Sequence, residues 1–359
     1  MVENGKDLKI GYTAYSHNYS TASDRRRFVG YAQHKGVTFE TADINKEYDV
    51  VILTYAVDIH QWLEKKRQAG DSLKLIFELQ DNYLVEPISL KTVFRGVGKY
   101  LKGTNGKLFW NYKNLLREAC QIADAVICSS EAQVKEIARY NDNVHICLDF
   151  FEKEATQVKS NFEVGDKLKI AWEGQSGTIR NLNIIKNVFY ELRNEIELHM
   201  ITDLEYYRFS NGLIKSKSSG IIFWIQCKKF FHAWKKETFN QKVIDCDIAL
   251  IPLDTTDAMK NGKSVNKLLL YWLMGMPVLT SATPAYQKAM QESGVHLAMH
   301  THENWCNAIR QFKNASPEER ATIAIKGFDF VKQRYNPDKV AMMWEKAIQS
   351  VIPIPSKTI

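Results

Sequence analysis

Residues 246–278, CDIALIPLDTTDAMKNGKSVNKLLLYWLMGMPV, are the stretch that decides the fold. A short apolar run ends near Pro252, a polar loop follows, and a helix is expected from Val265 to Gly275. Pro277 then opens a second apolar run. Near-continuous apolar runs without strict alternation are typical of parallel strands that are buried on both faces. The stretch therefore predicts a strand–helix–strand unit of a parallel sheet.

The same pattern recurs along the chain and restarts once. Short apolar runs separated by helical patterns stand on both sides of a Lys- and Glu-rich stretch at 152–167. Such alternation predicts right-handed βαβ units and doubly wound sheets, so we expect an α/β fold with two Rossmann-like sheets that face a cleft. The first domain is expected over 1–160 and the second over 161–337. The amphipathic segment 338–359 is a candidate for a helix that crosses back to the first domain, which periodicity alone leaves open.

Length and composition exclude several classes of protein. The chain has 359 residues, of which 45% are hydrophobic and 25% charged, as in an ordinary globular protein of two to three domains. The six cysteines show no CxxC pair and no cluster with histidine at metal-ligand spacing. They indicate free thiols in a reducing compartment. No signal peptide and no run of ~18 apolar residues is visible, so we expect a cytoplasmic protein.

The net charge of +7 is concentrated in two basic segments. Residues 91–117 contain seven basic and no acidic residues, and residues 204–242 contain eight basic and two acidic ones. Both segments also contain aromatic residues, a combination that suits an anionic membrane surface or an anionic glycan. The alternative is that the aromatic residues belong to the cores and the lysines to the solvated surface. No nucleic-acid partner is expected, because no stacking platform or recognition motif is evident.

The start of the helix expected near Val265 is a candidate anion site. Free N–H groups and the helix dipole favour an anion there, and Lys263 and Lys267 flank the first turn. A phosphate group is the ligand that this arrangement favours. The alternative is a lysine-flanked helix start on a solvated face.

Several motifs in sequence order resemble the donor-binding core of nucleotide-sugar-dependent glycosyltransferases with the two-domain GT-B fold, of the group 1 or family 4-like kind. Residues 247–278 fit DIxLxPL, a loop and GKxxxKLLxYxxxGxPV. IAWEGQSGT at 170–178 is similar to the start of the donor domain, and ADAVICSS at 123–130 resembles the strand that closes the first sheet. The similarity covers roughly residues 120–290.

The resemblance implies roles for residues of the second domain. Gly174 would let the backbone approach the donor phosphates, with Thr178 and Arg180 nearby. Lys263 and Lys267 would neutralise the departing diphosphate, so that no metal cofactor is needed. The lack of a DxD-type triplet in a suitable loop agrees with that expectation.

One departure from the family concerns the hydroxyl groups of the donor. Many retaining members have two glutamates eight positions apart, and the matching positions here are Gly262 and Leu270. Gly262 stays within the expected donor site, but neither side chain accepts a hydrogen bond. Either other groups hold the hydroxyls, or the donor differs, or activity is lost. Asp254 and Asp203 follow predicted strands and are candidates for contacts with base or ribose.

Candidate catalytic residues follow the strands of the first domain. His17 lies in the loop after the first strand and could deprotonate an acceptor hydroxyl, although a loop histidine can equally be merely exposed. Glu78 and Asp81 follow the third strand; either could be the base of an inverting enzyme or only a capping residue. His60 is a further candidate. The basic residues 25–27 are expected to lie partly on a solvated helix face.

These expectations lead to one main function and two alternatives. The main hypothesis is a metal-independent, retaining glycosyltransferase for hexosyl or related groups. It would use a nucleotide-diphosphate sugar and a lipid-linked, lipopolysaccharide or surface-polysaccharide acceptor at the inner face of the cytoplasmic membrane. The alternatives are a catalytically silent relative that binds a glycan or a partner protein, and a nucleotide-sugar epimerase.

Overall fold

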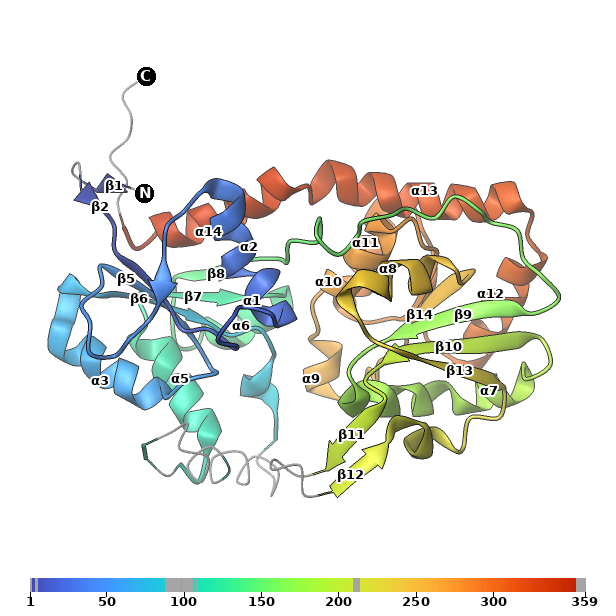
Figure 1. Ribbon diagram of the computed structural model, residues 1–359, viewed down its shortest axis with the longest axis horizontal. Helices are drawn as coiled ribbons and strands as arrows, with labels where there is room; N and C mark the ends of the chain where they lie inside the picture. Colours follow the sequence, from blue (N-terminus) through green and yellow to red (C-terminus); the bar gives the residue numbers. More distant parts are fainter. Residues whose placement is uncertain are drawn as a thin grey trace. The chain divides into compact units, whose positions relative to one another are not determined.

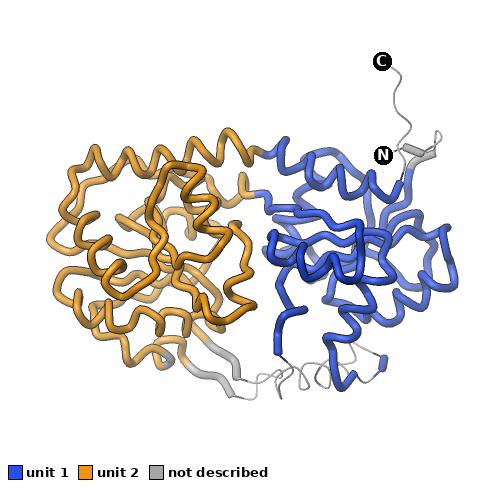
Figure 2. The backbone as a smooth tube through the Cα atoms, turned by 180° about the vertical axis from the view of Figure 1, so that it is seen from behind, with its two compact units in different colours: residues 1–150, 337–359 blue, residues 151–336 orange. Residues whose placement is uncertain are grey.

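The computed structural model describes residues 2–3, 6–87, 98, 106–107, 109–208 and 214–352. The chain divides into two compact units, which we call unit 1, residues 1–150 with 337–359, and unit 2, residues 151–336 (Figure 2). Within the described residues, each unit contains one six-stranded parallel sheet with helices packed around it (Figure 1). The predicted α/β class with two Rossmann-like parallel sheets is confirmed. Most of the basic segment 91–117 lies outside the described residues.

The sheet of unit 1 has the strand order β4-β3-β5-β6-β7-β8. Its strands are β3 (Ile10–Tyr12), β4 (Glu40–Thr41), β5 (Val50–Thr54), β6 (Lys74–Glu78), β7 (Ala125–Cys128) and β8 (Val144–Ile146). The helical elements are α1 (Ala22–Arg25), α2 (Phe28–Lys35), α3 (Ile59–Ala69), η1 (Gly70–Ser72), η2 (Tyr83–Val85), α5 (Tyr112–Ile122), α6 (Glu131–Ile137) and α14 (Pro337–Gln349). A small ribbon, β1 (Val2–Glu3) and β2 (Lys6–Asp7), precedes the sheet. From β3 the chain first adds β4 on one side and then adds β5 to β8 on the other side, so the strand order reverses between β3 and β5.

The core of unit 1 explains why these segments form strands and helices. Every residue of β5 and β7 is buried, as expected for strands covered on both faces. Leu115 and Leu116 of α5 are buried in the same cluster as Val51 and Phe77 of the sheet. Packing of this apolar helix face against the strands therefore holds the carboxyl ends of β5 and β6 in fixed positions.

The sheet of unit 2 has the order β13-β10-β9-β14-β15-β16. Its strands are β9 (Leu168–Glu173), β10 (Ile196–Thr202), β13 (Lys228–Ala233), β14 (Ile248–Ile251), β15 (Val278–Ser281) and β16 (Ala298–Met299), and β11 (Glu205–Arg208) and β12 (Ile214–Lys217) form an antiparallel ribbon. The helical elements are η3 (Ser176–Ile185), α7 (Lys186–Glu191), η4 (Ser218–Ile222), α8 (Lys236–Ile244), α9 (Ala258–Asn261), α10 (Asn266–Leu273), α11 (Pro284–Ser293), α12 (His302–Asn314) and α13 (Pro317–Arg334). Here the chain reverses between β9 and β14.

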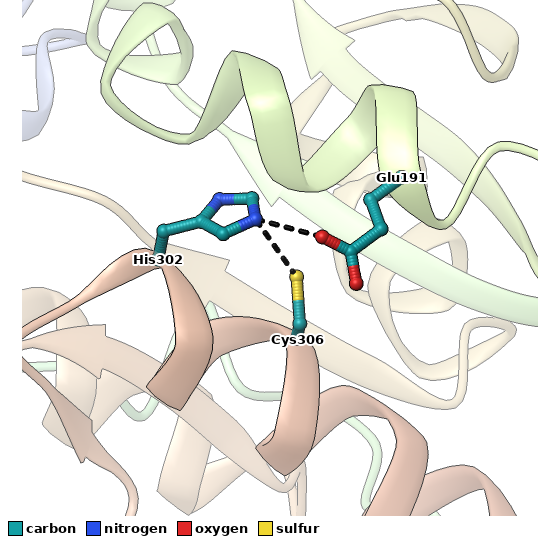
Figure 3. Close-up of side chains that lie close together, drawn as sticks. All are labelled: Glu191, His302 and Cys306. Carbon is teal, nitrogen blue, oxygen red and sulfur yellow. Dashed lines mark hydrogen bonds and ion pairs between the residues drawn. The ribbon is translucent and has the colours of Figure 1, made fainter.

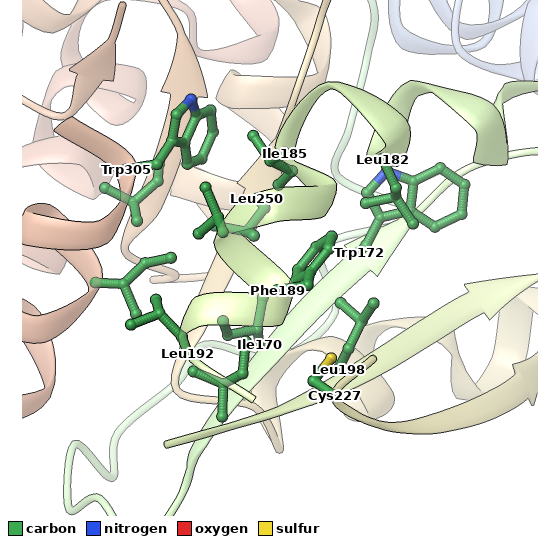
Figure 4. Close-up of a cluster of buried hydrophobic side chains, with 14 of the residues drawn as sticks. Ile170, Trp172, Leu182, Ile185, Phe189, Leu192, Leu198, Cys227, Leu250 and Trp305 are labelled. Atoms are coloured by element: carbon green, nitrogen blue, oxygen red, sulfur yellow. The ribbon is translucent and has the colours of Figure 1, made fainter. Parts of the chain in front are cut away.

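A buried apolar cluster holds the strands of unit 2 against helices α7 and α12. Ile170 and Leu198 of the sheet belong to one buried cluster with Phe189 of α7 and Trp305 of α12 (Figure 4). The expected helix between Val265 and Gly275 is α10, whereas the short α9 within the preceding polar loop was not predicted. None of the described helices has the length and apolar character that spanning a bilayer requires.

Candidate functional site

The predicted donor residues of unit 2 lie in the loops and at the starts of the helices that follow the strands at the carboxyl edge of its sheet. Gly174 directly follows β9, Asp254 lies in the loop after β14, and α10 begins beyond that loop. The strand order of unit 2 reverses between these two neighbouring strands. Ligands of open parallel sheets bind at such switch points, outside the carboxyl ends of the strands. The residues predicted to bind a donor therefore lie in the region where open parallel sheets bind ligands.

Gly174 stands where a side chain does not fit. A Cβ atom at this position would lie 2.7 Å from Thr178 Oγ1 and 2.9 Å from the ring of Trp172. The Thr178 hydroxyl donates a hydrogen bond to the Gln175 carbonyl at 2.8 Å. Thr178 and Arg180 are both exposed on η3. The structure thus places Gly174 and Thr178 next to each other at the start of η3, and Arg180 follows on the same helix.

Lys267 ties the start of α10 to the end of β9. Its Nζ donates to the Glu173 carbonyl at 2.7 Å and lies 2.9 Å from the Glu173 carboxylate. The Glu173 N–H donates to the Tyr271 hydroxyl at 3.1 Å, and burial together with the nearby Glu173 raises the pKa of Tyr271. These contacts join the end of β9 to α10, a helix that follows β14, and so connect the two strands between which the strand order reverses.

Glu173 was not among the predicted site residues. It immediately precedes Gly174 in the segment 170–178, so its position in that motif was the available signal. The side chains of Lys267 and Glu173 are 35% and 16% exposed, respectively. An incoming anion would therefore compete with Glu173 for a cation that solvent already reaches.

Asp254 and Asp203 have structural partners. Asp254 accepts hydrogen bonds from the Thr256 N–H at 3.1 Å and the Thr256 hydroxyl at 2.6 Å, which lower the pKa of Asp254. Asp203 accepts from the N–H of Ser176 at 3.2 Å and so holds the start of η3. Both acids shape loops at the carboxyl edge, and contacts with base or ribose stay a prediction for each.

The remaining two donor-site positions border α9. Gly262 is buried at the C-cap of α9 and donates its N–H to the Ala258 carbonyl at 3.1 Å. The N–H of Lys263 donates to the Lys260 carbonyl at 3.2 Å, and its side chain is half-buried. Leu270 is 2% exposed and belongs to the core. The position that matches the second family glutamate is therefore not accessible to a ligand.

In unit 1, a buried carboxylate organises the loop that carries His17. Asp24 is fully buried and accepts hydrogen bonds from the Tyr12 hydroxyl at 2.9 Å, the Thr21 hydroxyl at 2.7 Å and three donors on Tyr15 and Ser16. His17 itself is exposed in the turn above this carboxylate. Sequence reasoning missed Asp24, although the surrounding serine and threonine residues offer the donors that such an acid needs.

Glu78 is placed differently from the prediction. It is fully buried and forms an ion pair with Arg27, which also contacts Asp149 at 3.0 Å and the Cys147 carbonyl at 3.0 Å. Burial raises the pKa of Glu78, and the Arg27 guanidinium beside it acts in the opposite direction. This arrangement does not support Glu78 as a base for an acceptor hydroxyl, because the hydroxyl cannot reach it. Of the three basic residues 25–27, which were expected to lie partly on a solvated face, Arg27 is 2% exposed and is therefore the one that the fold buries.

Asp81 lies beside a row of tyrosines at the carboxyl edge of unit 1. The Tyr83 hydroxyl donates to Asp81 at 3.3 Å. Tyr55 packs edge-to-face against Tyr83 at 5.4 Å and against Tyr15 at 5.2 Å between ring centroids. Burial and the charge of Asp81 raise the pKa of Tyr55 to about 12. These half-buried rings, which sequence reasoning missed, come from the loops after three neighbouring strands.

The architecture of two such units is that of the GT-B fold class, and solved structures share it. HepE from Anabaena, in complex with UDP and glucose, is similar with a TM-score of 0.62 and 10% identity, covering 96% of this chain and 100% of that one. TarM is similar with a TM-score of 0.57 and 10% identity, covering 83% of this chain and 54% of that one. The S. aureus TarM G117R mutant, in complex with fondaparinux, alpha-GlcNAc-glycerol and UDP, has a TM-score of 0.54 and 11% identity over 84% of this chain and 56% of that one.

These similarities define the fold. The chain spans about half the length of TarM. No protein-family model matches the sequence, and no curated protein matches it significantly.

Proposed function

We propose that the protein is a glycosyltransferase whose nucleotide-diphosphate sugar binds at the carboxyl edge of unit 2. The observation that carries this proposal is the accessible Lys267 at the switch point, beside a glycine whose Cβ has no room. A close backbone approach and a cation that can change partner are what a diphosphate requires. UDP is bound in the structures of HepE and of the TarM G117R mutant, which is consistent with this donor class.

The chemistry follows from the charges at this edge. As the bond between the anomeric carbon and the diphosphate oxygen breaks, negative charge grows on the leaving group. Lys267 exchanges Glu173 for a phosphate oxygen, and Lys263 reaches the same group from the loop before α10. Fixed cations stabilise developing charge in this way without a metal ion. The acceptor oxygen bonds to the anomeric carbon, and its proton passes to a base or to the departing diphosphate.

The acceptor side is proposed on unit 1, with His17, Asp81 and the tyrosine row as candidate contacts. Half-buried aromatic rings with hydroxyl groups offer both an apolar face and hydrogen bonds to a sugar. We propose a glycan acceptor that is lipid-linked or part of a surface polysaccharide or lipopolysaccharide. Retention of the sugar's configuration is part of the same proposal.

Contact with the inner face of the cytoplasmic membrane is a further part of this proposal. Its support is the exposure of two aromatic residues within the basic segments: Trp110 is 68% and Phe223 80% exposed. Anionic vesicles should sediment the protein, and the double variant Trp110→Ala with Phe223→Ala should reduce the bound fraction. Added salt should reduce it as well, because lysine–lipid attraction is screened. If neither the double substitution nor added salt reduces vesicle binding, the proposed peripheral contact with the membrane is contradicted.

A catalytically silent relative is the second candidate function. It is favoured by the burial of Leu270 and by Gly262, which leave no carboxylate at the positions of the two family glutamates. Such a protein would still bind the nucleotide at Lys267 but would release no nucleoside diphosphate.

Thermal shift with a panel of nucleoside diphosphates and nucleotide sugars tests the donor site. One nucleotide should raise the melting temperature, Lys267→Ala should abolish most of the shift, and Lys326→Ala, an exposed lysine on α13, should leave it intact. A wild-type protein that no nucleotide stabilises would sink the proposal. Release of nucleoside diphosphate in the presence of glycan acceptors then separates the transferase from the silent relative.

A further inference from the structure

Three metal-binding side chains converge on the surface of unit 2. Glu191 is the last residue of α7, and His302 and Cys306 stand one turn apart at the start of α12 (Figure 3). His302 Nε2 lies 2.8 Å from Glu191 Oε2 and 3.5 Å from the Cys306 sulfur. One ligand atom from each residue lies within 4.8 Å of the others. Neither the donor site nor the acceptor side uses any of them.

We propose that Glu191, His302 and Cys306 bind a zinc ion. Zinc takes thiolate, imidazole and carboxylate ligands at about 2.3, 2.0 and 2.0–2.2 Å, usually in a tetrahedron. In that geometry a nitrogen and a sulfur ligand are roughly 3.5 Å apart, which is the separation of His302 Nε2 and Cys306 Sγ. The histidine nitrogen and the glutamate oxygen must separate by roughly 0.5 Å from their hydrogen bond. Rotation of two partly exposed side chains achieves this, and water completes the tetrahedron.

The elements that carry the ligands are held firmly. His302 and Cys306 form a pair at metal-ligand spacing that sequence reasoning missed. Their four-residue separation places both side chains on one face of α12. A capping box between Thr301 and Asn304 fixes the start of the helix. Cys306 is buried in the same apolar cluster as Phe189 of α7, so both helices are anchored to one core. The two helices are therefore held in place and only side-chain rotation is needed, which limits the entropic cost of binding the ion.

The surrounding charges suit a divalent ion. Arg310 contacts Glu191 Oε1 at 3.0 Å and Glu195 Oε1 at 3.4 Å, which leaves Glu191 Oε2 directed at His302. Such outer contacts orient a carboxylate ligand. The two glutamates and the arginine carry −1, so a Zn²⁺ ion that replaces the thiol proton brings the group to neutrality. Magnesium and calcium prefer oxygen ligands only, so the thiol and the imidazole favour zinc over these two ions.

The ion would clamp α7 to α12 and thereby stabilise unit 2. α7 ends shortly before β10 begins at Ile196, at the amino edge of the sheet, whereas the donor residues lie at the carboxyl edge. The zinc site is therefore independent of the proposed function. Zinc should raise the melting temperature without changing the affinity for a nucleotide.

Cobalt(II) is the probe for this site because its spectrum reports a thiolate ligand. The full-length protein, stripped of metal with a chelator, should bind one Co²⁺ with a sulfur-to-cobalt charge-transfer band, and Zn²⁺ should displace it. Cys306→Ser should abolish the band. Glu191→Gln and His302→Ala should each weaken Zn²⁺ binding by at least about 100-fold, because loss of an outer contact alone costs up to that much and these two residues are direct ligands.

Matched controls are Cys227→Ser, another buried thiol of unit 2, and His300→Ala, a neighbouring histidine outside the cluster. Both should keep the band and the affinity. The proposal is overturned if wild-type protein shows no charge-transfer band, if the band survives Cys306→Ser, or if Glu191→Gln binds Zn²⁺ as tightly as wild type. Should Cys306→Ser fail to fold, the exposed Glu191 decides the question, since its substitution removes no core contact.

Discussion

The carboxyl edges of the two sheets hold their ion pairs in opposite ways. In unit 1, Arg27 and Glu78 are 2% and 0% exposed. In unit 2, Lys267 and Glu173 are 35% and 16% exposed. A buried pair cannot lose a partner without leaving a charge unsolvated, whereas an accessible pair contributes little stability and can exchange its partner. Glu78 and Glu173 both stand at the end of a strand, so that position does not tell their roles apart. Their burial does: Glu78 is structural, whereas a ligand can displace Glu173.

The largest effect is expected for Glu78→Gln. The substitution preserves the shape of the side chain but leaves the Arg27 guanidinium buried with Asp149 as its remaining carboxylate. Breaking a buried ion pair costs about 3–5 kcal/mol of stability. Hydrogen exchange of the β6 amides measures this loss within unit 1 and avoids assuming two-state unfolding of the whole chain. Asp81→Asn is the matched control and should change stability little.

A different outcome would break the comparison between the two edges. If Glu78→Gln keeps the wild-type exchange rates and yet loses sugar transfer, Glu78 acts on the acceptor despite its burial. The pair in unit 1 would then be functional rather than structural.

The second effect is expected for Asp24→Ala. One hydrogen bond to a charged group contributes about 1.5–3 kcal/mol. Four of the five donors to Asp24 come from the loop that carries His17, in part-buried contacts where water can replace the carboxylate, so the net loss of stability should be about 2–3 kcal/mol. The loop should also become susceptible to proteolysis, because its backbone donors lose their acceptor. Limited proteolysis followed by mass spectrometry checks this. Asp43→Ala, an exposed loop acid, provides the control, and equal cleavage of both variants would refute the role of Asp24.

Gly174→Ala should have an intermediate effect confined to unit 2. Its Cβ would meet Thr178 and the Trp172 ring below 3.0 Å, and overpacking of this kind costs about 1–3 kcal/mol. Shifted backbone at the end of β9 should remove the thermal shift by nucleotide. Gly177→Ala, where nothing lies within 4 Å of the new atom, should retain it. Intact nucleotide binding by Gly174→Ala would show that the backbone here does not approach the ligand.

The local sequence was sufficient to predict two parallel sheets, but it did not predict every strand or the partners of the charged side chains. Neither β4 nor β13 was among the apolar runs that predicted strands. Strands such as β5 and β14 are short, uninterrupted runs of apolar residues, so the local sequence pattern identifies them. α9 was missed because it has only four residues, and its N-cap, Asp257, resembles any loop acid. Element existence thus follows from local pattern where the pattern is long enough.

Site prediction failed where contacts join distant positions. Arg27 stands in a basic run that is typical of a solvated helix face, yet its partners lie 51, 120 and 122 positions away. Glu173 was missed for a related reason, since Lys267 reaches it from 94 positions away across the switch point. The motif resemblance predicted Gly174 and Lys267 as separate site residues. Only the fold shows that Lys267 contacts Glu173, the residue that precedes Gly174.

The smallest effect, and the sharpest test of the comparison, is expected for Glu173→Gln. The Glu173 carboxylate attracts Lys267 in a half-buried pair that solvent still reaches, and solvent-accessible pairs are worth about 0–1 kcal/mol. If the only role of Glu173 is to pair with Lys267 until a phosphate group displaces it, removing its charge should tighten nucleoside diphosphate binding by about two- to fivefold, within that energy range. Isothermal titration calorimetry resolves such a change, and Glu195→Gln, in the same unit but at the amino edge, should leave the affinity as it is. If Glu173 instead accepts hydrogen bonds from the sugar or ribose, Glu173→Gln weakens binding, and the residue takes over part of the task that Gly262 and Leu270 cannot perform.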